Sequence, residues 1–236
     1  MIKLRVYAKL NLALNVLSCE QEGYHQLDMV NQSISLFDEI RIVPRPDERI
    51  SVHCDKDIGV INTAWTSASE FAKKFNTTGC DITIKKGIPM KGGLGGSSAD
   101  AAGVLVALAK WHKIPLEQVY SIADAVGSDV KYMMTGGLAR VRGKGEQVQT
   151  IESDSLVYFV VVMPQLVFLH ARFLKLSIKI RTLTLPTTMN SLKPLKTKNC
   201  HKFAITCAMG CNRRHLKSSQ NLKKFLTQQA NLAKFA

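Results

Sequence analysis

The sequence predicts an α+β fold, because two hydrophobic periods are mixed along its first 163 residues. Short runs with apolar residues at alternate positions predict strands, and a run with apolar residues at steps of three and four predicts an amphipathic helix. Hydrophobic residues make up 46% of the 236-residue chain, which is typical of a folded protein with a core. This length allows one large domain or two small ones.

Strands are expected at four places near the start of the chain: 1–8, its continuation 10–17, 38–43 and 50–53. Alternating apolar residues indicate the first of them. Pro44 and Pro46 end the third, because proline cannot donate to a strand ladder. Between the second and the third, Gly23-Tyr24-His25 is expected to form a polar turn.

A helix is expected to follow, with Asn62 as its cap, because apolar residues then recur on one face: Trp65, Ala68, Phe71, Ala72 and Phe75. Asp81–Lys85 alternates and predicts a strand that leads into a glycine-rich loop. Beyond the loop, Ser97 or Ser98 is expected to cap a helix whose buried face is rich in alanine and leucine. Further expected elements are a helix over 116–126, a strand over 138–142, and a strand over 156–163 that is buried on both faces.

The most informative segment is the glycine-rich loop before the alanine-rich helix, which reads PMKGGLGGSSADAA from Pro89 to Ala102. Four glycines within five residues allow sharp turns and bring bare N–H groups close to a ligand. The helix that follows directs its positive end to the same place, so the segment predicts a phosphate site and hence a nucleotide. It is not a Walker A loop, because Ser97 stands after Gly96 where that motif has lysine.

Five ordered pieces of the sequence resemble the GHMP small-molecule kinases: AKLNLALNV (8–16), EGYHQL (22–27), the glycine-rich loop, VGSDV (126–130) and GGLARVRGKGE (136–146). The match covers most of residues 1–163. The resemblance implies a two-domain architecture with an intact N-terminal domain over 1–155. Over 156–236 the expected C-terminal domain is incomplete or aberrant, because the family's second glycine-rich motif is absent from that part of the sequence.

The resemblance implies an ATP-dependent kinase whose catalytic pair is Lys9 and Asp129. Phosphoryl transfer depends mainly on alignment and on positive charge around the transferring group. Asp129 would accept the acceptor's hydroxyl proton or only orient that hydroxyl, and both roles stay open. Lys9 would stabilise the developing charge. Lys131, where the family has proline, stands close enough in sequence to alter the field at Asp129.

The resemblance also implies the ligands and the residues that bind them. The acceptor is expected to be 4-diphosphocytidyl-2-C-methyl-D-erythritol of the non-mevalonate isoprenoid pathway. Tyr24 and His25 would bind its cytosine, and Asn11, on the same strand face as Lys9, its erythritol part. Mg²⁺ is expected to arrive with ATP and to meet the hydroxyl of Ser97 or Ser98. The expected ATP-binding residues are Asn62, Lys86, Pro89, Met90, Lys91, Gly92, Gly93, Leu94, Gly95, Gly96, Ser97, Ser98 and Ala99.

The charge of the chain is divided sharply near Pro164. All 18 acidic residues and 18 of the basic ones precede residue 166, whereas residues 166–236 carry 14 basic residues and no acid. A shifted reading frame of the gene would produce such a change, and the coding DNA would reveal it. The alternative to an active kinase is therefore an impaired remnant whose basic tail binds polyanions without sequence specificity. The Cys and His residues of the tail, from Cys200 to His215, are interpreted as chance clustering rather than a zinc site.

The expected location is the cytoplasm. No apolar run approaches the roughly 18 residues of a membrane span, and Asn11 and Asn15 interrupt the apolar residues after the N-terminal lysines and arginine. The six cysteines are expected to be reduced thiols. The oligomeric state and a specific nucleic-acid partner are not indicated by any motif.

Overall fold

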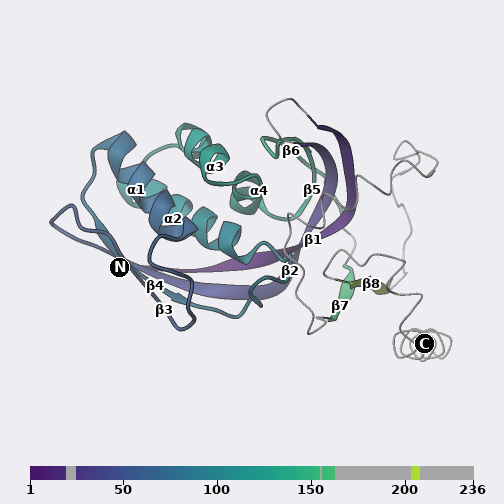
Figure 1. Ribbon diagram of the computed structural model, residues 1–236, viewed down its shortest axis with the longest axis horizontal. Coiled ribbons are helices and arrows are strands. Elements are labelled where there is room, and N and C mark those ends of the chain that lie inside the picture. The colour runs from purple at the N-terminus through teal and green to yellow at the C-terminus, as the bar shows by residue number, and fades with distance from the viewer. Residues whose placement is uncertain (20–24, 155, 163–202, 208–236) are drawn as a thin grey trace.

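The computed structural model describes residues 1–19, 25–154, 156–162 and 203–207. In this part, four α-helices lie along one face of a curved, six-stranded sheet (Figure 1). The strand order is β3-β4-β2-β5-β6, and β1 pairs with β2. The mixed architecture agrees with the predicted α+β class. The sheet strands are β1 (Ile2–Cys19), β2 (His25–Pro44), β3 (Ser51–Cys54), β4 (Cys80–Lys85), β5 (Leu138–Gly143) and β6 (Gln147–Thr150).

The two long strands β1 and β2 form the antiparallel centre of the fold. The second half of β2 pairs with β4 and the first half with β5, so β2 joins the two ends of the sheet. The expected strands 1–8 and 10–17 are one continuous strand. The expectation of a strand only over 38–43 was too short, because residues 25–37 extend it by pairing with β1 and β5.

The first two helices pack together over the sheet, and both define the site described below. Helix α1 (Thr63–Phe75) begins as expected, with the Asn62 side chain accepting a hydrogen bond from the Trp65 amide at 3.0 Å. Helix α2 is Gly96–His112, and ten of its residues are buried. The predicted serine cap of α2 is wrong. Gly95 occupies the cap position in a left-handed conformation, and no side chain caps the helix.

Three further corrections concern the second half of the chain. The expected helix over 116–126 is divided into a 3-10 turn, Leu116–Gln118, and helix α3, Tyr120–Val126. Helix α4 (Val130–Thr135) and strand β6 were not predicted. Strand β7 (Tyr158–Val162) pairs in parallel with β8 (Phe203–Cys207), but Tyr158 and Val160 are about half exposed. It is therefore not buried on both faces, because only the alternate residues Phe159 and Val161 pack on the core.

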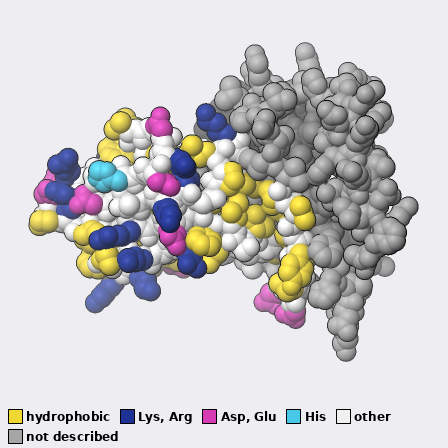
Figure 2. Space-filling model, turned by 90° about the horizontal axis from the view of Figure 1, so that it is seen from below, with side chains coloured by type: hydrophobic (Ala, Val, Ile, Leu, Met, Phe, Trp, Pro, Cys, Tyr) yellow, Lys and Arg dark blue, Asp and Glu magenta, His cyan; other side chains and the backbone are white. Residues whose placement is uncertain are grey.

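The helix-free face of the sheet carries acidic, basic and apolar side chains together (Figure 2). Arg5 lies over the Phe37 ring at 4.4 Å and pairs with Glu39 at 3.5 Å.

In the described residues, no helix is long and apolar enough to cross a membrane.

Candidate active site

The glycine-rich loop joins β4 to α2 and leaves its amides open. Lys91, Gly93 and Gly95 all have positive φ angles, of 59°, 69° and 74°. Such angles turn the chain repeatedly, so successive N–H groups form a concave surface of the kind that binds anions. Within the described ranges, no protein group accepts a hydrogen bond from the amides of residues 91–95. The first amides of α2 add to this set, because a helix start has no internal acceptors for them.

The loop lies directly against Lys9 of β1. The Lys9 amide donates to the Leu94 carbonyl at 2.9 Å, which fastens the loop to the sheet. The Lys9 side chain is 6% exposed, and its Nζ lies 3.2 Å from Oδ2 of Asp129. Asp129 stands at the start of α4, with its side chain 23% exposed. The structure thus brings the two expected catalytic side chains together beside the expected phosphate loop.

A row of hydrogen-bonded side-chain amides extends from Lys9 across strands β1 and β2. Lys9 Nζ donates to Asn11 Oδ1 at 2.7 Å, so the two side chains lie on one side of β1 as the strand period predicts. Asn11 Nδ2 donates in turn to Asn31 Oδ1 at 2.8 Å. Asn31 is fully buried, and its own Nδ2 has no hydrogen-bond partner in the described part of the chain. Asn31 was not among the predicted site residues, because it stands in a polar run, Asn31-Gln32-Ser33, in which nothing in the sequence distinguishes it.

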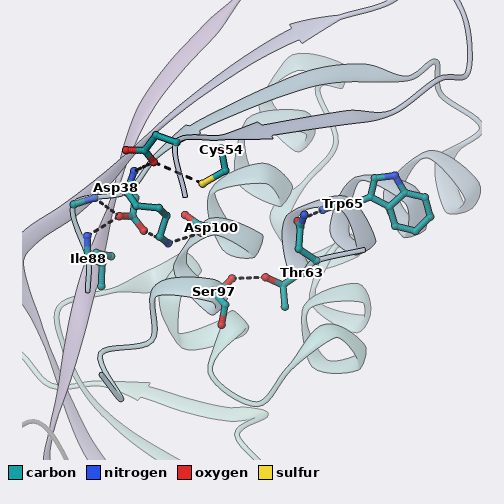
Figure 3. Close-up of polar contacts among 11 residues, drawn as sticks. Asp38, Cys54, Thr63, Trp65, Ile88, Ser97 and Asp100 are labelled. Atoms are coloured by element: carbon teal, nitrogen blue, oxygen red, sulfur yellow. Dashed lines mark hydrogen bonds and ion pairs between the residues drawn. The ribbon is translucent and has the colours of Figure 1, made fainter. Parts of the chain in front are cut away.

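Beneath the loop, a lysine and two aspartates form a buried charged cluster (Figure 3). Lys86 Nζ lies 2.5 Å from Asp38 Oδ2 and 2.7 Å from Asp100 Oδ2. All three side chains are at most 5% exposed. Lys86 was expected near the nucleotide, and the structure shows its ammonium group enclosed by the two carboxylates.

The protonation of this cluster is unusual. Burial raises the pKa of Asp100 to about 7, even though the Lys86 ammonium lowers it. Burial by itself would lower the pKa of Lys86, but the Coulombic attraction of Asp100 and hydrogen bonds to both carboxylates raise it overall. Lys86 therefore stays charged while Asp100 titrates near neutral pH.

Asn62 and the serines connect the starts of α1 and α2. Besides capping α1, Asn62 donates from Nδ2 to the Gly59 carbonyl at 3.0 Å. The Thr63 hydroxyl donates to the Ser97 carbonyl at 2.7 Å, which fixes the two helix starts side by side (Figure 3). Ser97 is exposed and Ser98 is half-buried at the beginning of α2, so the Ser97 side chain is accessible there.

Two lysines near the site lie in different surroundings. Lys131 follows Asp129 in sequence, but its Nζ lies 3.7 Å from Asp124 Oδ2 and 5.0 Å from the centre of the Tyr120 ring. Its charge is thus shared with helix α3. Lys91 is exposed on the loop. Tyr24 and the His25 side chain lie outside the described residues, as does the expected cluster from Cys200 to His215, except for the backbone of β8.

The fold around this site is similar to that of a family of small-molecule kinases. Residues 62–141 match the family model of the GHMP kinases N terminal domain. This match agrees with the resemblance of the sequence motifs, so the described N-terminal part of the chain is similar to the N-terminal domain of these kinases.

Two curated relatives and one solved structure show what the chain is similar to. The chain is 40% identical over 159 residues to a 4-diphosphocytidyl-2-C-methyl-D-erythritol kinase of Fervidobacterium nodosum, covering 64% of this chain and 55% of the relative. It is 42% identical over 147 residues to the same-named kinase of Pseudothermotoga lettingae, covering 61% and 53%. A solved structure of 4-(cytidine 5'-diphospho)-2C-methyl-D-erythritol kinase matches with a TM-score of 0.53 and 31% identity, covering 64% and 55%. The chain thus spans about half the length of the curated relatives that it matches.

Proposed function

We propose that the chain binds ATP and transfers its γ-phosphate to the 2-hydroxyl of 4-diphosphocytidyl-2-C-methyl-D-erythritol. The observation that carries this proposal is the convergence of Lys9 and Asp129, 3.2 Å apart, beside a loop with open amides. The names of the similar kinases support the choice of acceptor.

The loop from Pro89 to Ala99 is proposed to bind the phosphates of ATP. Its open amides and the positive end of α2 favour an anion, and neither requires a charged side chain. Lys91 is exposed on the same loop and would add positive charge. Met90, about two-fifths exposed, offers an apolar surface at the loop's edge. Asn62 stands near this site as the cap that holds α1 in place.

The Lys9–Asp129 pair is proposed to act on the acceptor hydroxyl. Asp129 is partly exposed, so its free oxygen can approach a hydroxyl while Oδ2 faces Lys9. A carboxylate in this position aligns the hydroxyl for in-line attack and accepts its proton in the same step or afterwards. Lys9 Nζ supplies a fixed positive charge that needs no reorganisation as negative charge develops on the transferring group.

The acceptor is proposed to lie along β1, with Asn11 next to its erythritol part. Asn11 already bonds to Lys9 and Asn31, so its orientation is fixed before any ligand arrives. Tyr24 and His25 are proposed to bind the cytosine.

Mg²⁺ is proposed to bind with ATP, where it would neutralise phosphate charge. The exposed hydroxyl of Ser97 at the start of α2 fits this task, because a hard oxygen ligand suits the ion, and Ser98 is the alternative. We also propose that residues 1–155 form the ATP- and substrate-binding domain, and that 156–236 form an aberrant basic C-terminal region.

A coupled assay of ADP release with the cytidyl acceptor tests the proposal. Asp129→Ala should lower kcat about 100-fold or more, which is typical of a lost general acid–base group. Asp124→Ala is the matched control, because this aspartate lies on α3 and pairs with Lys131. No ADP release from the unsubstituted chain with ATP bound would favour the impaired remnant. Equal turnover in Asp129→Ala and the unsubstituted chain would reject the proposed site.

A further inference from the structure

The charged cluster beneath the loop takes no direct part in the proposed reaction, yet it joins three elements that shape the loop. Asp38 lies on β2, Lys86 follows β4, and Asp100 is the fifth residue of α2. A cluster that served stability alone would be poorly suited to this position, because buried ion pairs often stabilise a fold no better than apolar residues do. The positions of these three side chains relative to the loop indicate a different role.

Asp38 fixes the point where the loop leaves the sheet. Its Oδ1 accepts hydrogen bonds from the amides of Gly87 and Ile88, both at 2.7 Å, and its Oδ2 contacts Lys86 (Figure 3). Both oxygens are therefore needed as acceptors at once. Only a carboxylate can do this, because an amide of the same shape would present a donor to one of the two partners.

Lys86 links this anchor to the other end of the loop. Its Nζ pairs with Asp100 on α2, and it lies 3.3 Å from the point that a Cβ on Gly96 would occupy. The ammonium group thus lies directly under the first residue of the helix. It holds the helix start at a fixed position relative to the strand from which the loop departs.

The charge of the cluster is compatible with a neighbouring anion. With Asp100 protonated, one ammonium balances one carboxylate, and the cluster does not repel phosphate. The raised pKa of Asp100 agrees with this state near neutral pH. The other titratable groups around Asp100 are Asp38, Lys86 and Cys54 of β3, and the Asp100 Oδ1 atom has no partner within the described residues.

We propose that Asp38, Lys86 and Asp100 form a positioning network that holds the glycine-rich loop in its nucleotide-binding shape without touching the nucleotide. The proposal rests on ATP binding at this loop, as proposed above. The network fixes both ends of the loop, so the amides between them are arranged before the ligand binds, and less free energy is spent on ordering them.

Direct titration of the full chain with Mg-ATP tests this inference, because it requires no acceptor and no turnover. Asp38→Asn preserves volume and should raise the Kd for ATP about tenfold, equivalent to the loss of one well-placed interaction. Lys86→Met should raise it at least as much. In steady-state kinetics of the same variants, KM for ATP should rise while kcat stays within about threefold, the split expected of preorganised binding rather than chemistry.

The matched control is Asp28→Asn, which breaks another buried carboxylate pair, with Arg140 at 2.8 Å on β5. It should destabilise the fold while leaving the Kd for ATP within about twofold. If Lys86→Met does not fold, Asp38→Asn still decides the question. Amide hydrogen exchange in the peptide over 87–98 should also be faster in Asp38→Asn than in Asp28→Asn.

An unchanged Kd in folded Asp38→Asn and Lys86→Met would overturn the positioning role while leaving the proposed function intact. Equal weakening by Asp28→Asn would also overturn it, because the effect would then follow from lost stability. If the unsubstituted chain fails to bind Mg-ATP, the proposed function fails first, and the inference with it.

Discussion

Gly95 is the residue at which the loop, Lys9 and helix α4 meet, so adding one methyl group there probes the whole proposed site. The residue has a φ of 74°, and a Cβ would lie 2.2 Å from Met133 Cε and 3.1 Å from Lys9 Cγ. Gly93, two residues earlier, has a similar φ of 69°, but a Cβ there would meet nothing within 4 Å. Gly93→Ala is therefore a matched control for the backbone strain alone.

The expected magnitudes follow from these distances. A left-handed alanine costs about 1–2 kcal/mol at either position. At Gly95, the Met133 methyl must also move by more than an ångström, and overpacking of this kind costs about 1–3 kcal/mol more. Lys9 must yield by a few tenths of an ångström. A displacement of about 1 Å at a reacting group can cost 100-fold in rate, so we expect a loss of about tenfold in kcat.

Two measurements on both variants check the reasoning: the free energy of unfolding in urea, and kcat from ADP release. Gly95→Ala should be less stable than Gly93→Ala and should lose more kcat, whereas Gly93→Ala should act mainly on KM for ATP. Equal losses of stability and of kcat in the two variants would refute the argument, because backbone strain alone would then explain both.

Three further predictions concern residues with defined partners. Asn31→Ala should lower kcat about tenfold with little change in KM for ATP, because Asn11 loses the acceptor that orients it toward Lys9; steady-state kinetics checks this. Asn62→Ala should cost about 1 kcal/mol of unfolding free energy, and Asn62→Asp should restore it by keeping the capping acceptor, as thermal denaturation would show. The folded-state pKa of Asp100 is raised to about 7 from 3.8, so its contribution to stability is full below about pH 4 and is lost as pH rises through 7. Urea unfolding at pH 5 and pH 8 should show a loss of at most about 3 kcal/mol, because each pH unit between 5 and 7 contributes about 1.4 kcal/mol, and Asp100→Asn should remove it.

Local patterns were sufficient to predict the elements whose stability is local. Helix α1 has a cap and an apolar face within 14 residues, and both were readable from the sequence. The first half of β2 was missed because Asn31, Gln32 and Ser33 interrupt its apolar pattern. That segment is a strand because it has partners on both sides, β1 and β5, and pairing of this kind is a tertiary effect that overrides local propensity.

The site could be predicted only in part from local signals. The glycine-rich loop predicts an anion site by its composition, whereas Lys9 and Asp129 are 120 positions apart, and only the family resemblance joined them. The resemblance did not anticipate that the Lys86 side chain is buried. Its partners Asp38 and Asp100 lie on β2 and α2. The sequence around Lys86 therefore gives no indication of Asp38, which is far away along the chain.

The course of β1 explains how Lys9 is positioned. The pairing of β1 with β2 is irregular between Tyr7 and Lys9, and again between Asn11 and Ala13. As a result Ala8, Lys9 and Leu10 are all buried, which a regular alternation does not allow. The Lys9 amide is free to bond to the Leu94 carbonyl, and its side chain turns toward Asp129. Bulges redirect side chains at the expense of regular strand pairing. Sequence patterns do not reveal the irregularity between Tyr7 and Lys9, yet it is this irregularity that connects the sheet to the loop.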